Sequence, residues 1–195
     1  MKKTTTLIGV IAVIVLAILW GVKINNSMVA KEESVSKAWS NVESQYQRRA
    51  DLIPNLVNTV KGYAQHESET LESVIAARAA ATKVTIDPTQ LTEEQLQNYQ
   101  QLQNNVGSAL GRLIATVEQY PDLKANQNFM ELQAQLEGTE NRISVERQNY
   151  NNTASEYNTY IRKFPQSLIA GIAGFDKKPY FKAEAGSETA PKVEF

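Results

Sequence analysis

Large apolar side chains recur at every seventh position near the end of this chain: Phe129, Leu136, Ile143, Tyr150, Tyr157 and Phe164. Seven residues are close to two turns of an α-helix, so these side chains fall along one helix face. A half-buried strand would instead alternate apolar and polar residues. The pattern therefore predicts one long helix, from about Gln127 to Lys163, which ends at Pro165 and packs along a coiled-coil-like seam.

A second seam lies earlier in the chain. It comprises Val35, Trp39, Val42, Tyr46, Arg49, Ile53, Leu56, Val60 and Tyr63, at alternating spacings of four and three. Pro54 lies inside this pattern, where a proline removes a backbone donor and clashes with the carbonyl of Ala50. The helix is either broken there, with Asp51 as an N-cap, or kinked and continuous. The unbroken seam favours a continuous helix that runs on to about Thr82.

A further helix follows a loop at residues 84–91. Thr92 and Gln95 match a capping box, in which the side chain of each bonds the backbone N–H of the other. Apolar residues then recur at helical spacing until Pro121. Three long striped segments joined by short loops predict an all-α fold, a long antiparallel, up-and-down helical bundle. The seam residues that we expect to be mostly buried are Trp39, Tyr150 and Tyr157.

The N-terminus carries an uncharged stretch, Thr4 to Val22, directly after Lys2 and Lys3. As a helix it would extend about 28 Å, close to the ~30 Å hydrocarbon core of a bilayer. A cleaved signal peptide is the alternative, but no convincing cleavage site with small residues follows. We expect this stretch to cross the lipid bilayer and to stay attached. The chain then divides into a transmembrane anchor at residues 1–23, a bundle at 24–176 and a flexible tail at 177–195.

The lysines that flank this stretch decide little about orientation. Lys2, Lys3 and the amino terminus favour a cytoplasmic N-terminus by the positive-inside bias. Lys23, Lys31 and Lys37 follow the stretch closely and oppose that bias. On balance we expect residues 4–22 to hold a bundle that lies outside the cytoplasm.

The residue inventory offers little for catalysis. Charge is balanced, with 20 Lys and Arg against 21 Asp and Glu, so we expect no nucleic-acid partner. No cysteine is present to form a disulfide or a thiolate metal site. His66 is the single histidine, and Tyr63 rather than a glutamate stands three places before it, so the Glu-x-x-His pattern of di-metal bundles is absent. We expect His66 to be an exposed helix residue, and we expect no catalytic residue, cofactor or metal.

Two further features concern packing inside the bundle. Gly107 and Gly111 place small residues four apart on one helix face, which predicts the close approach of a neighbouring helix. Arg49 and Glu146 fall on seam positions, where an unpaired charge is rarely buried. Their side chains either reach the bundle surface or pair with each other and fix the register of the helices, and the sequence leaves both alternatives open.

A family resemblance rests on four segments that follow one another along the chain: Ala38-Trp39 through Arg48–Val57, Tyr120–Asn126, Tyr157-Asn158 with Phe164-Pro165 and Leu168–Ala170, and Ala190–Phe195. Together they span nearly the whole chain after the anchor, and the chain resembles the LemA family of bacterial membrane proteins. The resemblance implies an N-terminal membrane helix, a helical bundle and no established biochemical activity. Family members are often encoded near membrane-embedded metalloproteases or TPM-domain proteins, which implies partners in envelope maintenance. Orientation in the family has been predicted both ways, and no catalytic residues carry over.

These features predict a single-pass protein of the bacterial inner membrane. We expect it to be a non-enzymatic helical scaffold or adaptor of the cell envelope, acting with a membrane protease or a TPM-domain protein. A membrane-tethered sensor or ligand-binding bundle is the alternative, and a cavity would distinguish it. An enzyme with carboxylates and arginines on facing helices is a third hypothesis. Because Gly9, Ala12, Ala17 and Gly21 permit close helix approach in lipid, we expect a homo-oligomer or a complex with another membrane protein.

Overall fold

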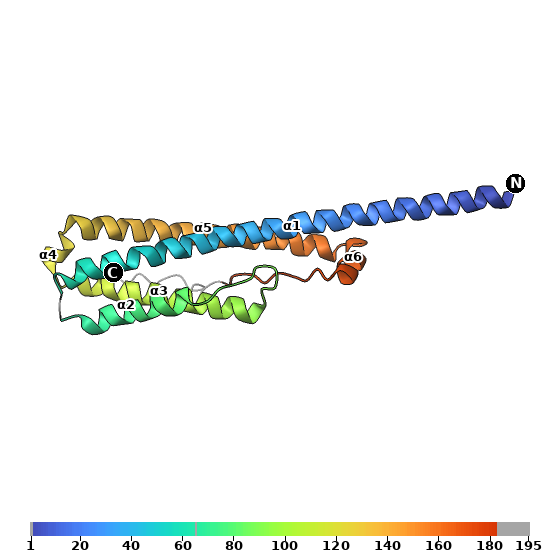
Figure 1. The fold of residues 1–195 in the computed structure, drawn as a ribbon. Coiled ribbons are helices and arrows are strands. Elements are labelled where there is room, and N and C mark those ends of the chain that lie inside the picture. Colours follow the sequence, from blue (N-terminus) through green and yellow to red (C-terminus); the bar gives the residue numbers. More distant parts are fainter. Residues whose placement is uncertain (1, 65, 183–195) are drawn as a thin grey trace, which may run out of the picture.

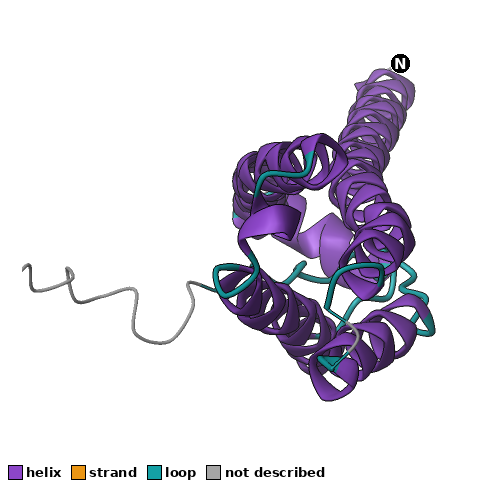
Figure 2. Cartoon of the chain, turned by 90° about the vertical axis from the view of Figure 1, so that its left-hand side faces the viewer, coloured by secondary structure: helices purple, strands orange, loops and turns teal. Residues whose placement is uncertain are grey.

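The computed structural model describes residues 2–64 and 66–182 of the chain. All regular structure within these residues is helical: α1 (Lys2–Lys61), α2 (Ser68–Thr82), α3 (Glu93–Val117), α4 (Pro121–Lys124), α5 (Gln127–Arg162) and α6 (Gln166–Ala173). The long helices run antiparallel along one another, and the N-terminal part of α1 projects from one end (Figure 1). Seen along the bundle, they surround a common core (Figure 2). The predicted all-α bundle behind an N-terminal apolar helix is confirmed.

The helix α1 is continuous over 60 residues and joins the predicted anchor to the bundle. Its apolar side chains from Leu7 to Val22 are mostly exposed, and burial begins at Ile24 and Met28. By length and composition, this N-terminal part could cross a membrane. The rest of α1 extends roughly 58 Å at about 1.5 Å per residue, so it reaches the far end of the bundle.

Pro54 lies inside α1, as the continuous alternative predicted. A proline leaves the carbonyl four residues earlier without its usual helical donor. That carbonyl belongs to Ala50, and Nε of Arg78 in α2 donates to it at 2.7 Å. A side chain from a neighbouring helix therefore replaces the missing backbone hydrogen bond, and α1 continues past the proline.

The prediction that the same helix runs on to Thr82 is wrong. α1 ends at Lys61, where the carbonyl of Val60 accepts from the N–H groups of Tyr63 and Ala64. The chain then reverses, and α2 packs against α1 and α3. Buried apolar residues continue on both sides of the turn, so the periodicity of the sequence does not reveal the break.

Both α3 and α5 begin at side-chain caps. The Thr92 hydroxyl accepts from the Gln95 N–H at 3.2 Å, and the Gln95 side chain accepts from the Thr92 N–H at 3.0 Å. The predicted capping box is therefore confirmed. Asn126 caps α5 by accepting from the Phe129 N–H. These side chains satisfy donors that the first turn of a helix leaves free.

The predicted long helix agrees with α5 to within one residue at its end. Its heptad positions Phe129, Leu136, Ile143, Tyr150 and Tyr157 are buried, and so is Trp39 on α1, as predicted. The last heptad position, Phe164, lies beyond the helix and is 81% exposed, so its predicted seam position is wrong. Tyr63, at the end of the first seam, is also largely exposed, because it already lies in the turn after α1.

The core consists of two apolar clusters that follow one another along the bundle. The cluster nearer the predicted membrane span is rich in aromatic rings and surrounds Trp39. The other cluster is mainly aliphatic and includes Leu56 and Leu113. Between them lies a polar layer formed by Arg49 of α1, Gln103 of α3 and Glu140 of α5, called the Arg49 layer below.

After α6, residues 175–182 form an extended segment, the strap, which runs back along the bundle (Figure 1). Lys178 and Phe181 of the strap are buried. The packed domain therefore continues through Lys182, and the expected boundary after residue 176, with a flexible tail from 177, is wrong for the strap. The rest of that expected tail, residues 183–195, lies outside the described residues.

Candidate functional site

A channel runs along the bundle between α3 and α5. Within the described residues these two helices make few direct contacts, because α3 packs mainly on α2 and α5 mainly on α1. The strap occupies the part of the channel nearer the predicted membrane span. Beyond Lys182, from the Arg49 layer onward, the channel is an open groove.

Two asparagines of α5 hold the strap by its backbone. Asn158 donates to the carbonyl of Lys178 and accepts from its N–H, both at 2.8 Å. Asn151 contacts Phe181 in the same way, both at 2.9 Å. A side-chain amide carries a donor and an acceptor side by side, so it satisfies both backbone groups of one extended residue. Such contacts depend on the conformation of the backbone rather than on the identity of the strap side chains.

The spacing of these contacts matches the geometry of a helix to that of an extended chain. Asn151 and Asn158 lie two turns apart on α5, about 10.5 Å along its axis. Phe181 lies three residues beyond Lys178, about 10 Å in an extended chain. Two amides that lie two helical turns apart on α5 therefore meet two strap residues that lie three positions apart.

The end of the strap is held from both walls of the channel. Gln100 of α3 donates to the carbonyl of Lys182 at 2.8 Å and accepts from its N–H at 3.4 Å. Arg147 of α5 donates to the same carbonyl at 3.1 Å. Because the contacts on α5 move from Asn158 towards Arg147, the strap points along the channel towards Glu140 and the Arg49 layer.

The strap side chains fix it to the core. Phe181 stacks on Trp39, with ring centroids 5.9 Å apart and planes 5° apart. Its ring also meets Tyr150 edge-on at 5.3 Å. The buried ammonium of Lys178 lies 2.7 Å from a carboxylate oxygen of Glu32 on α1. A paired buried charge is tolerated where an unpaired one is not, so this ion pair defines one position for the strap.

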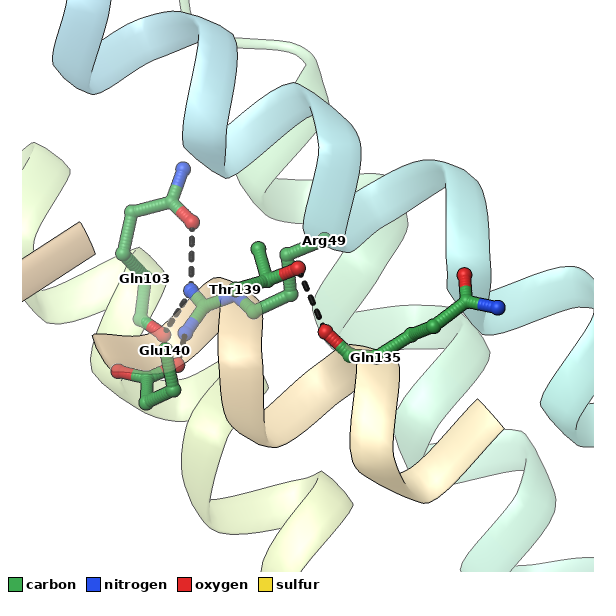
Figure 3. A network of polar contacts seen from close by, with 5 residues as sticks. All are labelled: Arg49, Gln103, Gln135, Thr139 and Glu140. Carbon is green, nitrogen blue, oxygen red and sulfur yellow. Dashed lines mark hydrogen bonds and ion pairs between the residues drawn. The ribbon is translucent and has the colours of Figure 1, made fainter. Parts of the chain in front are cut away.

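In the Arg49 layer, the side chains of Arg49, Gln103 and Glu140 point toward one another (Figure 3). Nη1 of Arg49 donates to Oε2 of Glu140 at 2.7 Å. Nη2 donates to the side-chain oxygen and the backbone carbonyl of Gln103 at 2.8 and 2.9 Å. The Arg49 side chain is 4% exposed, whereas that of Glu140 is 58% exposed. A buried cation is therefore balanced by a carboxylate that water still reaches.

The predicted pairing of Arg49 with Glu146 is wrong, and so is a surface position for Arg49. Arg49 does not reach the bundle surface, and its carboxylate partner is Glu140, which lies nearly two turns from Glu146 on α5. Glu146 accepts from the side chain of Asn149 at 3.2 Å. A seam position predicts the level of a charge in the core, but not which carboxylate of the next helix reaches it.

The open groove has a volume of about 460 Å³. Its α3 wall includes Gly107, Ser108, Gly111 and Ile114, and its α5 wall includes Leu136, Glu137 and Glu140. The volume lies in the range of small-ligand pockets, roughly 300–1,000 Å³. Apolar walls with a few polar groups along them suit either an extended peptide or a small, largely apolar ligand.

The small residues of α3 do not bring another helix close. A Cβ built on Gly111 would meet nothing within 4 Å, and one on Gly107 would meet only Nη1 of Arg49, at 3.9 Å. The prediction that Gly107 and Gly111 allow close helix approach is therefore wrong. These glycines widen the groove and leave room for the guanidinium of Arg49.

The single histidine of the chain does not line the groove. His66 is exposed, as predicted, but it lies in the turn between α1 and α2 rather than on a helix. Across residues 2–64 and 66–182, no three His, Cys, Asp or Glu side chains are placed to hold a metal ion. Burial raises the pKa of the Tyr99 and Tyr150 phenols above the usual value, so both stay protonated further into the alkaline range than exposed tyrosines do.

Comparison with known sequences decides the family. A model of the LemA family matches residues 38–195, which include α1 from just before Trp39, the other helices of the bundle and the whole strap. The chain belongs to the LemA family. The resemblance seen in the sequence segments is thereby confirmed.

Relatives of this LemA-family protein include two magnetosome proteins. MamQ 2 of Paramagnetospirillum magneticum is 29% identical over 181 residues, and MamQ of Magnetospirillum gryphiswaldense is 28% identical over 185 residues. Each alignment covers 84% of this chain and 66% of the relative, so the chain spans just under two thirds of either MamQ protein. Protein LemA of Metamycoplasma hominis is 26% identical over 145 residues, covering 74% of this chain and 63% of that protein. The candidate membrane helix and these relatives fit a membrane-associated protein.

Two segments of the LemA resemblance contribute directly to the channel. One supplies Arg49, and the other supplies Asn158. Sequence reasoning missed the amides that hold the strap, although a signal for them exists. Tyr150-Asn151 and Tyr157-Asn158 repeat one dipeptide at the heptad spacing, which places the two amides on the same face of the helix, beside the buried seam.

Proposed function

We propose that this LemA-family protein is a membrane-anchored, non-enzymatic scaffold or adaptor of the bacterial cell envelope, with a single-pass anchor and a bundle outside the cytoplasm. The observation that supports an adaptor is the channel between α3 and α5. It holds an extended segment by its backbone and continues as an open groove. The partner is a membrane or envelope protein, and membrane-embedded metalloproteases and TPM-domain proteins are the first candidates.

An extended peptide is the occupant that best suits the groove. The strap lies in the same channel and is held through its backbone, so the channel already accommodates this conformation. Beyond the strap, Gly107 and Gly111 leave space where a side chain would otherwise stand. Glycines permit the close approach of another backbone, so an extended segment of a partner can lie against α3.

Photo-crosslinking in native membranes tests the proposed function. A photoreactive p-benzoylphenylalanine replaces Ser108 in the groove, and the matched control carries it at Asn105, which is exposed on α3 outside the groove. We expect capture of one defined envelope protein from Ser108 and none from Asn105. Adding Gly111→Trp fills the groove and should abolish the capture while the protein stays in the membrane. Equal capture from both positions, or capture that survives the filled groove, contradicts the proposal.

The chain's own residues 183–195 are the competing occupant, because they follow directly after Lys182. A variant that ends at Lys182 separates the two cases. With an external partner, capture from Ser108 persists in this variant. If Ser108 crosslinks only within its own chain, and if shortening the chain removes that product without exposing a partner, the groove is an internal packing site and the adaptor proposal fails.

A membrane-tethered sensor or ligand-binding bundle is the second candidate, and the volume of the groove, about 460 Å³, favours it. Native mass spectrometry of the protein in mild detergent distinguishes the two candidates. A sensor carries a small added mass that Gly111→Trp removes. An adaptor instead carries a second protein or a second copy of this chain.

A further inference from the structure

Apolar side chains are unusually exposed around α6. Ile172 is 89% exposed and Phe164 is 81% exposed, more than any other large apolar side chain among the described residues. Leu168 lies between them in sequence and is also exposed. The spacing of four places Leu168 and Ile172 on one face of α6. Such a patch at the surface of a folded domain marks a contact with another apolar phase.

The opposite face of α6 packs where the bundle meets the apolar part of α1. Ala170 is buried in the aromatic cluster. Cδ1 of Ile169 lies 3.9 Å from the position that a Cβ on Gly21 would take. Gly21 belongs to the last turn of the exposed apolar stretch that ends at Val22, and Ile24 is the first buried residue of α1. Therefore α6 lies level with the end of the candidate membrane span (Figure 1).

Basic side chains surround this patch. Arg162, Lys163 and Lys177 are exposed beside α6, and Lys23 is exposed on α1 at the same level. Asp176 is the exposed acid among them. An apolar helix face bordered by cations is typical of helices that lie in a membrane interface, where the cations meet anionic headgroups.

We propose that α6 and Phe164 lie in the interface of the same bilayer that α1 crosses, with Phe164, Leu168 and Ile172 inserted among the lipid chains. The inference rests on the proposed membrane span of α1. A bundle that is attached to the membrane through α1 alone has no second contact to set its angle to the membrane plane. A second contact through α6 fixes its angle, and so fixes the direction in which the channel between α3 and α5 faces.

Spin labelling of the full chain in lipid nanodiscs tests this inference. The chain contains no cysteine, so single-cysteine variants give single labels. Leu168→Cys and Ile172→Cys report on α6, and Val15→Cys reports on the span. Val145→Cys, an exposed apolar position in the middle of α5, is the matched control. The discs contain phosphatidylethanolamine with a smaller share of phosphatidylglycerol, and one protein copy each.

We expect the labels at Leu168 and Ile172 to be relaxed more by oxygen, which concentrates in lipid, than by a water-soluble nickel chelate. The label at Val145 should show the reverse. If Ile172 resembles Val145 while Val15 remains in lipid, the contact through α6 is refuted and the span stands. If Val15 is itself exposed to the chelate, the proposed span fails, and with it the inference. Protection of Ile172 that requires two copies in a disc identifies a second chain as the occupant and overturns the lipid contact.

Discussion

At the residue scale, Arg49 lies where the core changes from its aromatic to its aliphatic cluster. A buried charge without a partner is strongly destabilising, so the helices are stable only where Gln103 and Glu140 meet the guanidinium. Apolar seams alone tolerate a shift of one turn, because the next turn presents similar side chains. The Arg49 layer therefore selects one register among three helices.

The two members of the ion pair are expected to differ when removed. Glu140→Ala leaves a guanidinium buried without a counter-charge, and should lower the free energy of unfolding by about 3 kcal/mol or more. Arg49→Met leaves a carboxylate that water reaches, so we expect a loss of about 1–2 kcal/mol. Urea unfolding measures both, with Glu137→Ala on the same wall as the control. A larger loss for Arg49→Met than for Glu140→Ala would contradict the explanation.

Two buried phenols predict how stability depends on alkaline pH. Burial raises the pKa of Tyr99 and Tyr150 above the ordinary value of about 10. Near pH 10 the unfolded chain loses these protons while the folded bundle keeps them. The folded state then binds more protons, so this stabilisation is fully present below pH ~10 and is lost as the pH rises further.

Ultraviolet titration of tyrosinate absorbance checks this expectation. In the folded protein, the signals assigned through Tyr99→Phe and Tyr150→Phe should be missing near pH 10 and should appear together with unfolding. Reversible ionisation of either phenol near pH 10, with the helical signal intact, would show that it is not shielded from water.

At the scale of elements, side chains from neighbouring helices support backbone that cannot support itself. Arg78 of α2 replaces the donor that Pro54 removes from α1, and the asparagines of α5 replace the strand partner that the strap lacks. Each of these segments is therefore stable only in the assembled bundle. The contribution of each hydrogen bond can be measured by changing the neighbouring side chain that supplies it.

The contact between Arg78 and Ala50 should matter only while Pro54 is present. In the natural sequence, Arg78→Met leaves the Ala50 carbonyl without a donor, and we expect the free energy of unfolding to fall by about 1 kcal/mol. In a Pro54→Ala background, the backbone N–H of the new alanine donates to the Ala50 carbonyl. Arg78→Met should then lower the free energy of unfolding much less. A double-mutant cycle of unfolding free energies measures the difference. Additive effects would show that Arg78 stabilises the bundle by another contact.

The strap should loosen when one of its amides loses its donor. Asn158→Asp keeps the side-chain shape but places a carboxylate against the carbonyl of Lys178. We expect hydrogen exchange at the Lys178 and Phe181 N–H groups to quicken on the order of tenfold, or about 1.4 kcal/mol of local opening. Asn152→Asp, exposed on the same helix, is the control. Equal exchange in the two variants would mean that side-chain packing alone holds the strap.

At the scale of the whole molecule, one helix carries both the candidate span and a wall of the bundle. Leu7 to Val22 expose apolar side chains, and burial starts two residues later, without a linker between them. Cleavage after this stretch would cut through α1, which passes unbroken from the span into the bundle, and the sequence offers no convincing small-residue cleavage site there. The intact mass of the mature protein should therefore include residues 7–22. A mature chain that begins near Lys31 would refute the retained anchor.

The side of the membrane that carries the bundle is open to direct measurement. In the chain, which lacks cysteine, Asn152→Cys introduces one exposed thiol on α5. A bundle outside the cytoplasm predicts labelling by a membrane-impermeant maleimide in intact spheroplasts. Labelling only after lysis places the bundle in the cytoplasm and reverses the proposed orientation.

The sequence by itself determined the features that depend on local or repeated signals. Helical periodicity predicted α5 and the burial of Trp39, the capping box predicted the start of α3, and the uncharged stretch predicted the candidate span. Each of these features depends on residues that are close to one another in the sequence, within a few helical turns. The continuous α1 also followed from its unbroken seam, even across Pro54.

Only the tertiary structure decided the turn after Lys61, the partner of Arg49 and the strap, and with them the channel. The apolar seam continues across the turn, so its period carries no sign of the reversal. A seam position sets the depth of Arg49 in the core, but the carboxylate that reaches it depends on how another helix is aligned. The strap forms its backbone hydrogen bonds with side chains distant in sequence, so it leaves no periodic pattern of its own.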